Sequence, residues 1–140
     1  MRLDEGACWQ RLRSTAHGVL GTVHERRGVD LVPVVFVVVD GRVVIPIDTV
    51  KAKGGARLQR LTNLTVDSRC TLLVERYADD WAHLWWVRAH GLATESAADP
   101  GRVTALGAAF PAYREPGAVA SLIVVSVQGV TGWSAAPDPS

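Results

Sequence analysis

Apolar and polar residues alternate, or gather in short runs of β-branched residues, along most of the chain. This pattern is typical of strands. The first such segments are residues 17–25 and the valine-rich run 29–39, and Asp40-Gly41 follows them. An Asp-Gly pair tolerates the positive φ angles of a type I′ turn, so it predicts a hairpin whose second strand is 42–48. Pro33, inside the valine-rich run, predicts an edge strand or a bulge.

Four further segments have strand character, namely 70–77, 82–95, 121–128 and 130–134. The total of six or seven strands, mostly adjacent in sequence, favours hairpin connections and therefore an antiparallel sheet. That many strands in one small domain favour closure of the sheet into a barrel. We expect a single mainly β domain over residues 1–136, followed by a disordered tail at 137–140.

Two or three short helices complete the prediction. The first lies near the N-terminus, where apolar residues recur at helical spacing: Trp9, Leu12 and Ala16. Gly54-Gly55 introduce a second short helix. Asp99 followed by Pro100 is a typical N-cap and first helical residue, and this pair predicts a helix through about Ala109.

Composition and charge exclude several classes of function. The 140 residues have a net charge of +1, so no global field favours nucleic acid or an anionic membrane. The apolar run before Asp40 has nine residues, far fewer than the ~20 that cross a bilayer, and the N-terminus has no signal-like apolar segment. Cys8 and Cys70 have no companion ligands at metal-binding spacing. We expect a cytoplasmic protein with free thiols and no metal.

A basic segment lies between Asp48 and Asp67, and it contains no acid. Its positive residues are Lys51, Lys53, Arg57 and Arg60. In the predicted helix the two arginines are i,i+3 neighbours on one face, and the two lysines project to one side of an extended segment. Together with a glycine pair that allows close backbone approach, this pattern suits a phosphate group. A solvated basic helix face is the alternative interpretation.

Three of the five tryptophans lie within residues 81–86. Side chains alternate between the two faces of a strand, so Trp86 and Arg88 share one face while Trp85 and Val87 share the other. Two adjacent indoles therefore do not both enter one small core. One is expected to pack inward, and the other to be covered by a partner subunit or by a flat ring.

Residues for catalysis are harder to assign. The histidines have no metal-binding spacing, and no serine lies in a G-x-S-x-G motif. Tyr77 and His83 are the nearest candidates for a proton donor or acceptor, and the sequence assigns neither. We name no catalytic residue.

Several landmarks occur in a familiar order. They are "VLGTV", "LVPVVF", the Asp-Gly hairpin, "IDTVKAKGGARLQRLTN", "DDWAHLWWVRAHGLA", "FPAYRE" and "VTGWSA". Over about residues 5–136 the chain resembles the pyridoxamine-phosphate-oxidase-like split-barrel flavoprotein superfamily. Within it, the chain is most similar to the small actinobacterial-type branch associated with coenzyme F420, a deazaflavin.

The resemblance implies a six-stranded antiparallel Greek-key split barrel that works as a homodimer. It also implies a groove between the subunits that holds a flavin or deazaflavin. In that groove Lys51, Lys53 and Arg57 would face the phosphate end, with Arg60 as a second-ranked contact. Val34 and Val35 would flank the ring, and Trp86 would contact it from the neighbouring subunit.

The implied function is that of an F420-dependent oxidoreductase, which transfers a hydride to or from a small organic substrate. Flavin mononucleotide (FMN) is the alternative cofactor, and a non-catalytic dimeric carrier of a planar ligand is the alternative function. Two departures from the family's sequence pattern bear on the choice among these cofactors and functions. Val29-Asp30 stands where many relatives have a pair such as Arg-Pro, and residues 54–56 lack the hydroxyl or basic side chains common there.

Overall fold

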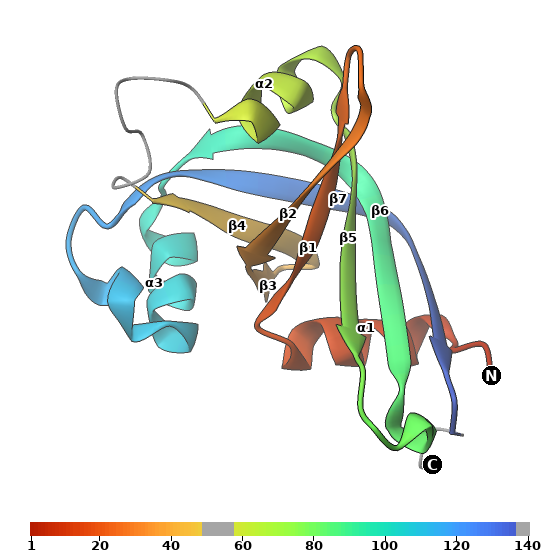
Figure 1. The fold of residues 1–140 in the computed structure, drawn as a ribbon. Helices are drawn as coiled ribbons and strands as arrows, with labels where there is room; N and C mark the ends of the chain where they lie inside the picture. The colour runs from red at the N-terminus through yellow and green to blue at the C-terminus, as the bar shows by residue number, and fades with distance from the viewer. Residues whose placement is uncertain (49–57, 137–140) are drawn as a thin grey trace.

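The computed structural model describes residues 1–48 and 58–136 and is shown in Figure 1. One antiparallel sheet contains the strands β1 (His17–His24), β2 (Gly28–Val35), β3 (Val37–Val39), β4 (Arg42–Asp48), β5 (Arg69–Arg76), β6 (Trp85–Ala97) and β7 (Val119–Ser134). The helices are α1 (Glu5–Ser14), α2 (Gln59–Val66) and α3 (Pro100–Ala109), with short 3₁₀ turns η3 (Trp81–His83) and η4 (Pro111–Arg114). The mainly β prediction is confirmed for this part of the chain.

The order of the strands requires the sheet to curl. That order is β2-β1-β5-β6-β7-β4-β3, so the two edge strands, β2 and β3, are consecutive in sequence. Only Phe36 separates them, and its backbone N–H donates to the carbonyl of Ala16 at 3.1 Å. A single residue can join opposite edges only if the sheet bends round until the edges meet. β2 accordingly contacts β4, and the remaining gap between them is the split of the barrel.

Three strands differ from the predicted ones by more than one or two residues at an end. The run 29–39 is not one strand, because Phe36 turns the chain from one sheet edge to the other. Residues 121–128 and 130–134 belong to one long strand, β7, which continues past a register shift opposite His90 and Gly91. β6 begins at Trp85 and not at residue 82, because Asp80 caps the turn η3. The described strands therefore number seven, where the resemblance implied six.

The core lies on the concave side of the sheet. β6 shows the alternation that produces it, because Val87, Ala89, Gly91 and Ala93 are buried while Arg88, His90 and Leu92 are exposed. Helix α1 packs over one end of the sheet, as Figure 1 shows. It buries Cys8 and Leu12. Helix α3 packs against β3 and β4 over a second, smaller apolar cluster.

Two local predictions are confirmed by backbone geometry. Asp40 and Gly41 have φ angles of 50° and 73°, as a type I′ hairpin turn requires. Asp99 caps α3 by accepting a hydrogen bond from the Arg102 N–H at 3.0 Å, and Pro100 begins the helix. Among the described helices, none has the length and apolar character needed to cross a bilayer.

Candidate functional site

A cleft of about 210 Å³ opens at the split between β2 and β4. We call it the split cleft. It is lined by His17, Pro33, Val34, Val35, Pro46, Asp48, Arg60 and Tyr113. The edge strand β2 forms its apolar wall, β4 the opposite wall, and α2 and η4 supply the arginine and the tyrosine. The cleft brings together Val34, Val35 and Arg60, three of the predicted cofactor-binding residues.

Asp48 and Arg60, the charged residues of the split cleft, have opposite charges and differ in their hydrogen bonding. The Asp48 carboxylate accepts a hydrogen bond from the Tyr113 hydroxyl. The Nε nitrogen of Arg60 is buried and has no hydrogen-bond partner within residues 1–48 and 58–136. Because a buried donor without an acceptor is costly, this nitrogen is suited to an oxygen atom of a ligand.

Burial perturbs two ionisable groups here. Burial, and next the hydrogen bond to Asp48, raises the pKa of Tyr113 to about 12, so its hydroxyl stays a proton donor at physiological pH. Burial lowers the pKa of Arg60 from its usual value while the nearby Asp48 charge opposes that effect. The usual pKa of an arginine is so far above physiological pH that Arg60 remains a cation despite this lowering.

Helix α2 holds Arg60 at the cleft because a buried asparagine fixes the helix to the sheet. Asn63 is only 3% exposed, and its Nδ2 donates to Thr22 Oγ1 at 3.0 Å and to Asp30 Oδ2 at 2.9 Å. Gln59 Nε2 in turn donates to Asn63 Oδ1 at 2.8 Å. The amide of Asn63 thus makes three hydrogen bonds, which fixes the position of α2 against β1 and β2.

Three of the predicted residues, Lys51, Lys53 and Arg57, lie outside the described residues. Two described residues on either side of this stretch, Asp48 at the end of β4 and Arg60 in α2, both line the split cleft.

Trp86 does not line the split cleft of its own subunit. It lies on the outward face of β6 and lines a separate cavity of about 550 Å³, which we call the indole cavity. The other lining residues are Leu73, Glu75, Tyr77, Leu84, Trp85 and Arg88. The guanidinium carbon of Arg88 lies 4.5 Å from the Trp86 ring centroid, which fits a cation–π contact. Trp85 packs against the core, as expected for one of the two indoles, and the covering of Trp86 by a partner or a ring stays a prediction.

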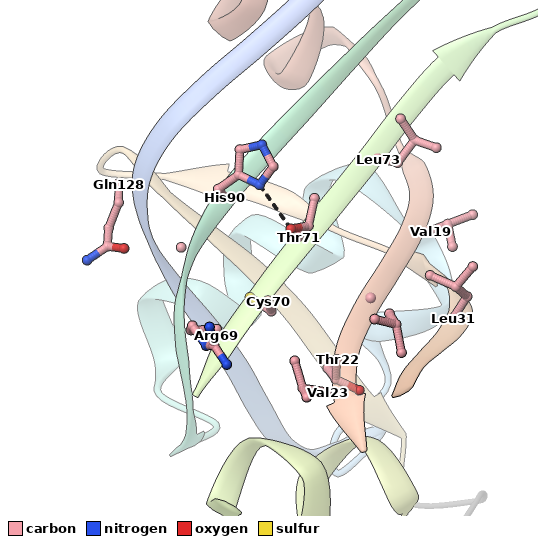
Figure 2. A pocket seen from close by; sticks show the side chains of 13 residues that line it. Val19, Thr22, Val23, Leu31, Arg69, Cys70, Thr71, Leu73, His90 and Gln128 are labelled. Atoms are coloured by element: carbon pink, nitrogen blue, oxygen red, sulfur yellow. Dashed lines mark hydrogen bonds between the residues drawn. The ribbon is translucent and has the colours of Figure 1, made fainter. Parts of the chain in front are cut away.

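The outward face of β1, β2 and β5 is apolar. Val29 and Leu31 are 63% and 70% exposed, and Val19 stands opposite Leu73 in the β1–β5 ladder. Figure 2 shows the shallow pocket of about 430 Å³ that these strands form, with Thr71 Oγ1 and His90 Nδ1 3.0 Å apart at its polar side. Gly21 contributes no side chain there, and Leu31 packs closely over it, since an added Cβ would lie 3.2 Å from Leu31 Cδ2.

The two weak catalytic candidates lie apart from the split cleft. Tyr77 is exposed and borders the indole cavity. His83 is also exposed, and its Nε2 lies 3.6 Å from Asp80 Oδ2. The described part of the chain contains no group of side chains that could hold a metal ion. Burial raises the pKa of the Cys70 thiol to about 11, so this cysteine is a poor nucleophile.

Sequence reasoning did not find Asp48 or Tyr113 as site residues. Asp48 ends a predicted strand, and Tyr113 belongs to the "FPAYRE" landmark, but nothing in the pattern pairs them. Their contact depends on α3 and η4 folding back onto β4. The signal that could have drawn attention to Asp48 is an acid directly in front of a basic segment.

Comparisons with known proteins show the fold. The chain matches no model of a protein family, and no curated protein matches its sequence. It is similar in structure to an FAD-binding protein from Mycobacterium smegmatis, with a TM-score of 0.66, 19% identity, and coverage of 95% of this chain and 96% of that one. A Corynebacterium glutamicum structure with a provisional pyridoxamine 5′-phosphate oxidase assignment has a TM-score of 0.62 at 17% identity, covering 94% and 90%.

A third similar structure is the heme storage protein HutZ from Vibrio cholerae. Its TM-score is 0.65 at 14% identity, with coverage of 93% of this chain and 94% of that one. Proteins of this architecture therefore bind different planar groups, and the architecture does not by itself name the ligand. This chain has the fold of the pyridoxamine 5′-phosphate oxidase-like split-barrel proteins.

Proposed function

We propose that the protein is a cytoplasmic, homodimeric oxidoreductase that binds a phosphorylated flavin-type cofactor, coenzyme F420 in the first place and FMN in the second. The observation that carries the proposal is the split cleft. It gathers Val34, Val35 and Arg60, and it is also lined by Asp48, the residue directly before the basic segment. When bound, such a cofactor supplies the hydride-transfer chemistry, while the protein supplies binding, orientation and exclusion of water.

The residues present fit such a group. Val34 and Val35 offer an apolar wall to a flat ring, and the buried Nε of Arg60 offers an unused donor to an oxygen atom. Lys51, Lys53 and Arg57 are proposed to bind the phosphate, because charge-assisted hydrogen bonds to phosphate are the strong ones. The small organic substrate is proposed to lie against the exposed face of the ring.

The homodimer is part of the proposal. Trp86 lies outside its own split cleft, on an outward face, so it could close only the cleft of a second copy. The apolar face around Val29 and Leu31 supports the same arrangement, since large apolar patches on a surface are usually covered by a partner. In this arrangement each subunit provides one wall of its partner's site.

Titration of the purified protein with each cofactor tests the proposal. Binding of F420, followed by quenching of tryptophan fluorescence, is the expected result. Yellow protein that releases FMN on denaturation would favour the second cofactor. If neither cofactor binds at micromolar concentrations, the proposed function is wrong.

The basic segment is tested by the double substitution Lys51→Ala with Lys53→Ala. We expect it to weaken binding of the phosphorylated cofactor by roughly 2–4 kcal/mol, because charged hydrogen bonds contribute ~1.5–3 kcal/mol each and the two effects overlap. The matched control is Arg26→Ala, which removes an exposed cation at the β1–β2 turn. Unchanged affinity in the double variant would mean that the segment is a solvated basic surface.

A non-catalytic carrier of a planar ligand is the second candidate. It is favoured by the likeness in structure to HutZ. The two functions differ in turnover. An oxidoreductase consumes its reduced cofactor when a suitable electron acceptor is added, whereas a carrier binds the cofactor and leaves its oxidation rate unchanged.

A further inference from the structure

The indole cavity has the size and the lining of a site for a small flat molecule. Its volume of about 550 Å³ lies within the ~300–1,000 Å³ typical of ligand pockets. Most of its wall is apolar or aromatic, and it comes from Leu73, Tyr77, Leu84, Trp85 and Trp86. Aromatic walls pack well against a flat ring, in stacked or edge-on contact. The two remaining lining residues are charged, and they define the polar group that the ring carries.

Arg88 is held in position for an anion. It lies two residues after Trp86 on β6, so both side chains are on the outward face. Its guanidinium carbon is 4.5 Å from the Trp86 ring centroid, and this contact restricts the long side chain before any ligand binds. A guanidinium that packs on an aromatic face keeps the N–H groups at its edge for other partners. With residues 1–48 and 58–136 the Arg88 guanidinium makes no hydrogen bond or ion pair, so its donors are open to a ligand.

Glu75 limits the charge of that ligand. It stands opposite Trp86 in the β5–β6 ladder while Leu73 stands opposite Arg88, so Glu75 and Arg88 are diagonal neighbours on one face. Glu75 is exposed and lines the same cavity. One negative charge is balanced by Arg88, whereas a second one would meet the Glu75 carboxylate and be repelled. A carboxylate therefore fits the cavity better than a phosphate monoester, which carries more than one charge at neutral pH.

We propose that the indole cavity binds the small organic substrate, and that this substrate is a planar aromatic acid with one carboxylate. The carboxylate takes two parallel hydrogen bonds from Arg88, and the ring lies against the apolar wall. The inference rests on the proposed function, in which Trp86 closes the split cleft of a second copy and brings the cavity to that copy's cofactor. It deepens that function, because it names the class of molecule that exchanges a hydride with the cofactor.

The test compares two ligands with the same ring. 2-Naphthoate carries a carboxylate, and 2-naphthol carries an uncharged hydroxyl group. Their dissociation constants are measured by isothermal titration calorimetry with the cofactor-free wild type, Arg88→Gln and Arg76→Gln. We expect the wild type to bind 2-naphthoate roughly tenfold more tightly, because hydrogen bonds between charged groups are the strong ones. Arg88→Gln should weaken 2-naphthoate by roughly the same factor and leave 2-naphthol unchanged.

Arg76→Gln is the matched control. Arg76 is an exposed arginine of β5 that stands opposite Trp85 and does not line the indole cavity, so its substitution should alter neither affinity. Equal affinities of the wild type for the two ligands would overturn the inference. Equal losses of both ligands in Arg88→Gln would overturn it as well, since they would mean that Arg88 only supports the indole ring.

A third ligand, naphthalene-2,6-dicarboxylate, tests the part assigned to Glu75. We expect the wild type to bind it more weakly than 2-naphthoate, and Glu75→Gln to tighten its binding severalfold, because a like charge is removed. An unchanged affinity of Glu75→Gln for the dicarboxylate would show that the limit to one charge is wrong.

Titration with F420 and FMN separates this inference from the proposed function. We expect the cofactor and 2-naphthoate to bind together. Cofactor binding without any binding of 2-naphthoate would refute the substrate class and leave the proposed function in place. Displacement of 2-naphthoate by either cofactor would assign Arg88 to the cofactor and likewise refute the substrate class. Binding of 2-naphthoate by a protein that binds neither cofactor would refute the substrate role together with the proposed function.

Discussion

Asp30 connects the β1–β2 hairpin to helix α2. Arg27 donates to it from Nε and Nη2 at 2.8 and 3.0 Å, and Asn63 donates from the other side. The hydrogen bond from Arg27, followed by that from Asn63, lowers the pKa of Asp30 to about 2. The unfolded chain has an aspartate pKa of about 3.9, so Asp30 stabilises the folded state above that pH. This contribution is lost as the pH falls toward the folded-state pKa.

The loss of folding stability at acid pH should depend on Arg27. We expect the free energy of unfolding, measured by urea titration, to fall between about pH 4 and pH 2, and Arg27→Gln to make that fall less steep. Part of the slope should remain, because Arg69 likewise lowers the pKa of Asp67 to about 2. Identical slopes for the wild type and Arg27→Gln would show that the Arg27–Asp30 ion pair does not contribute to this fall in the free energy of unfolding.

At the scale of elements, sequence patterns predicted the structure correctly wherever residues adjacent in sequence determine the local geometry. The Asp40-Gly41 turn, the Asp99 cap of α3 and the division of Trp85 from Trp86 were all predictable, since each depends on neighbours in sequence. The break at Phe36 was not, because β-branched residues surround it and only the pairing of β3 with β4 separates the two strands. Tertiary contacts decide such boundaries.

The long strands β6 and β7 depend on a bulge that a glycine makes possible. Their register shifts at His90 and Gly91, where Gln128 has no counterpart. A Cβ atom added at Gly91 would lie closer to the Ser126 carbonyl oxygen than side chains tolerate, and that oxygen belongs to the backbone. The strand must therefore move to accept any side chain at this position.

We expect Gly91→Ala to lower the free energy of unfolding by roughly 1–3 kcal/mol, the usual cost of overpacking. Gly129→Ala is the matched control, because an added Cβ there meets nothing within 4 Å. It lies across the ladder from His90, so it tests the same bulge. Thermal or urea unfolding of both variants gives the comparison, and equal stabilities would contradict the steric argument.

At the scale of the whole molecule, the site could be predicted only in part. Val34, Val35 and Arg60 were expected together and lie together in the split cleft. Asp48 and Tyr113 were missed, because the curl of the sheet and the packing of η4 bring them into contact from distant parts of the chain. The pairing of each cleft with an indole from a second copy stays a prediction.

The apolar outward face allows a direct test of that pairing. We expect Leu31→Asp to convert a dimer to a monomer in sedimentation experiments, because a buried, unpaired charge at an interface costs several kcal/mol. The control is Val66→Asp, which changes a residue of similar exposure, 61%, at the end of α2 and away from that face. Two variants with the same oligomeric state would remove the support that this face gives to the dimer.

The central place of β7 has a consequence for biosynthesis. This strand pairs with β6 on one side and with β4 on the other, so β3 and β4 are joined to the rest of the sheet through it. While the ribosome is still adding residues 119–134, β4 and β6 each have an unpaired edge. Since exposed edges invite aggregation, the nascent chain depends on residues 119–134, and on whatever shields those edges until these residues are made, to reach the native state.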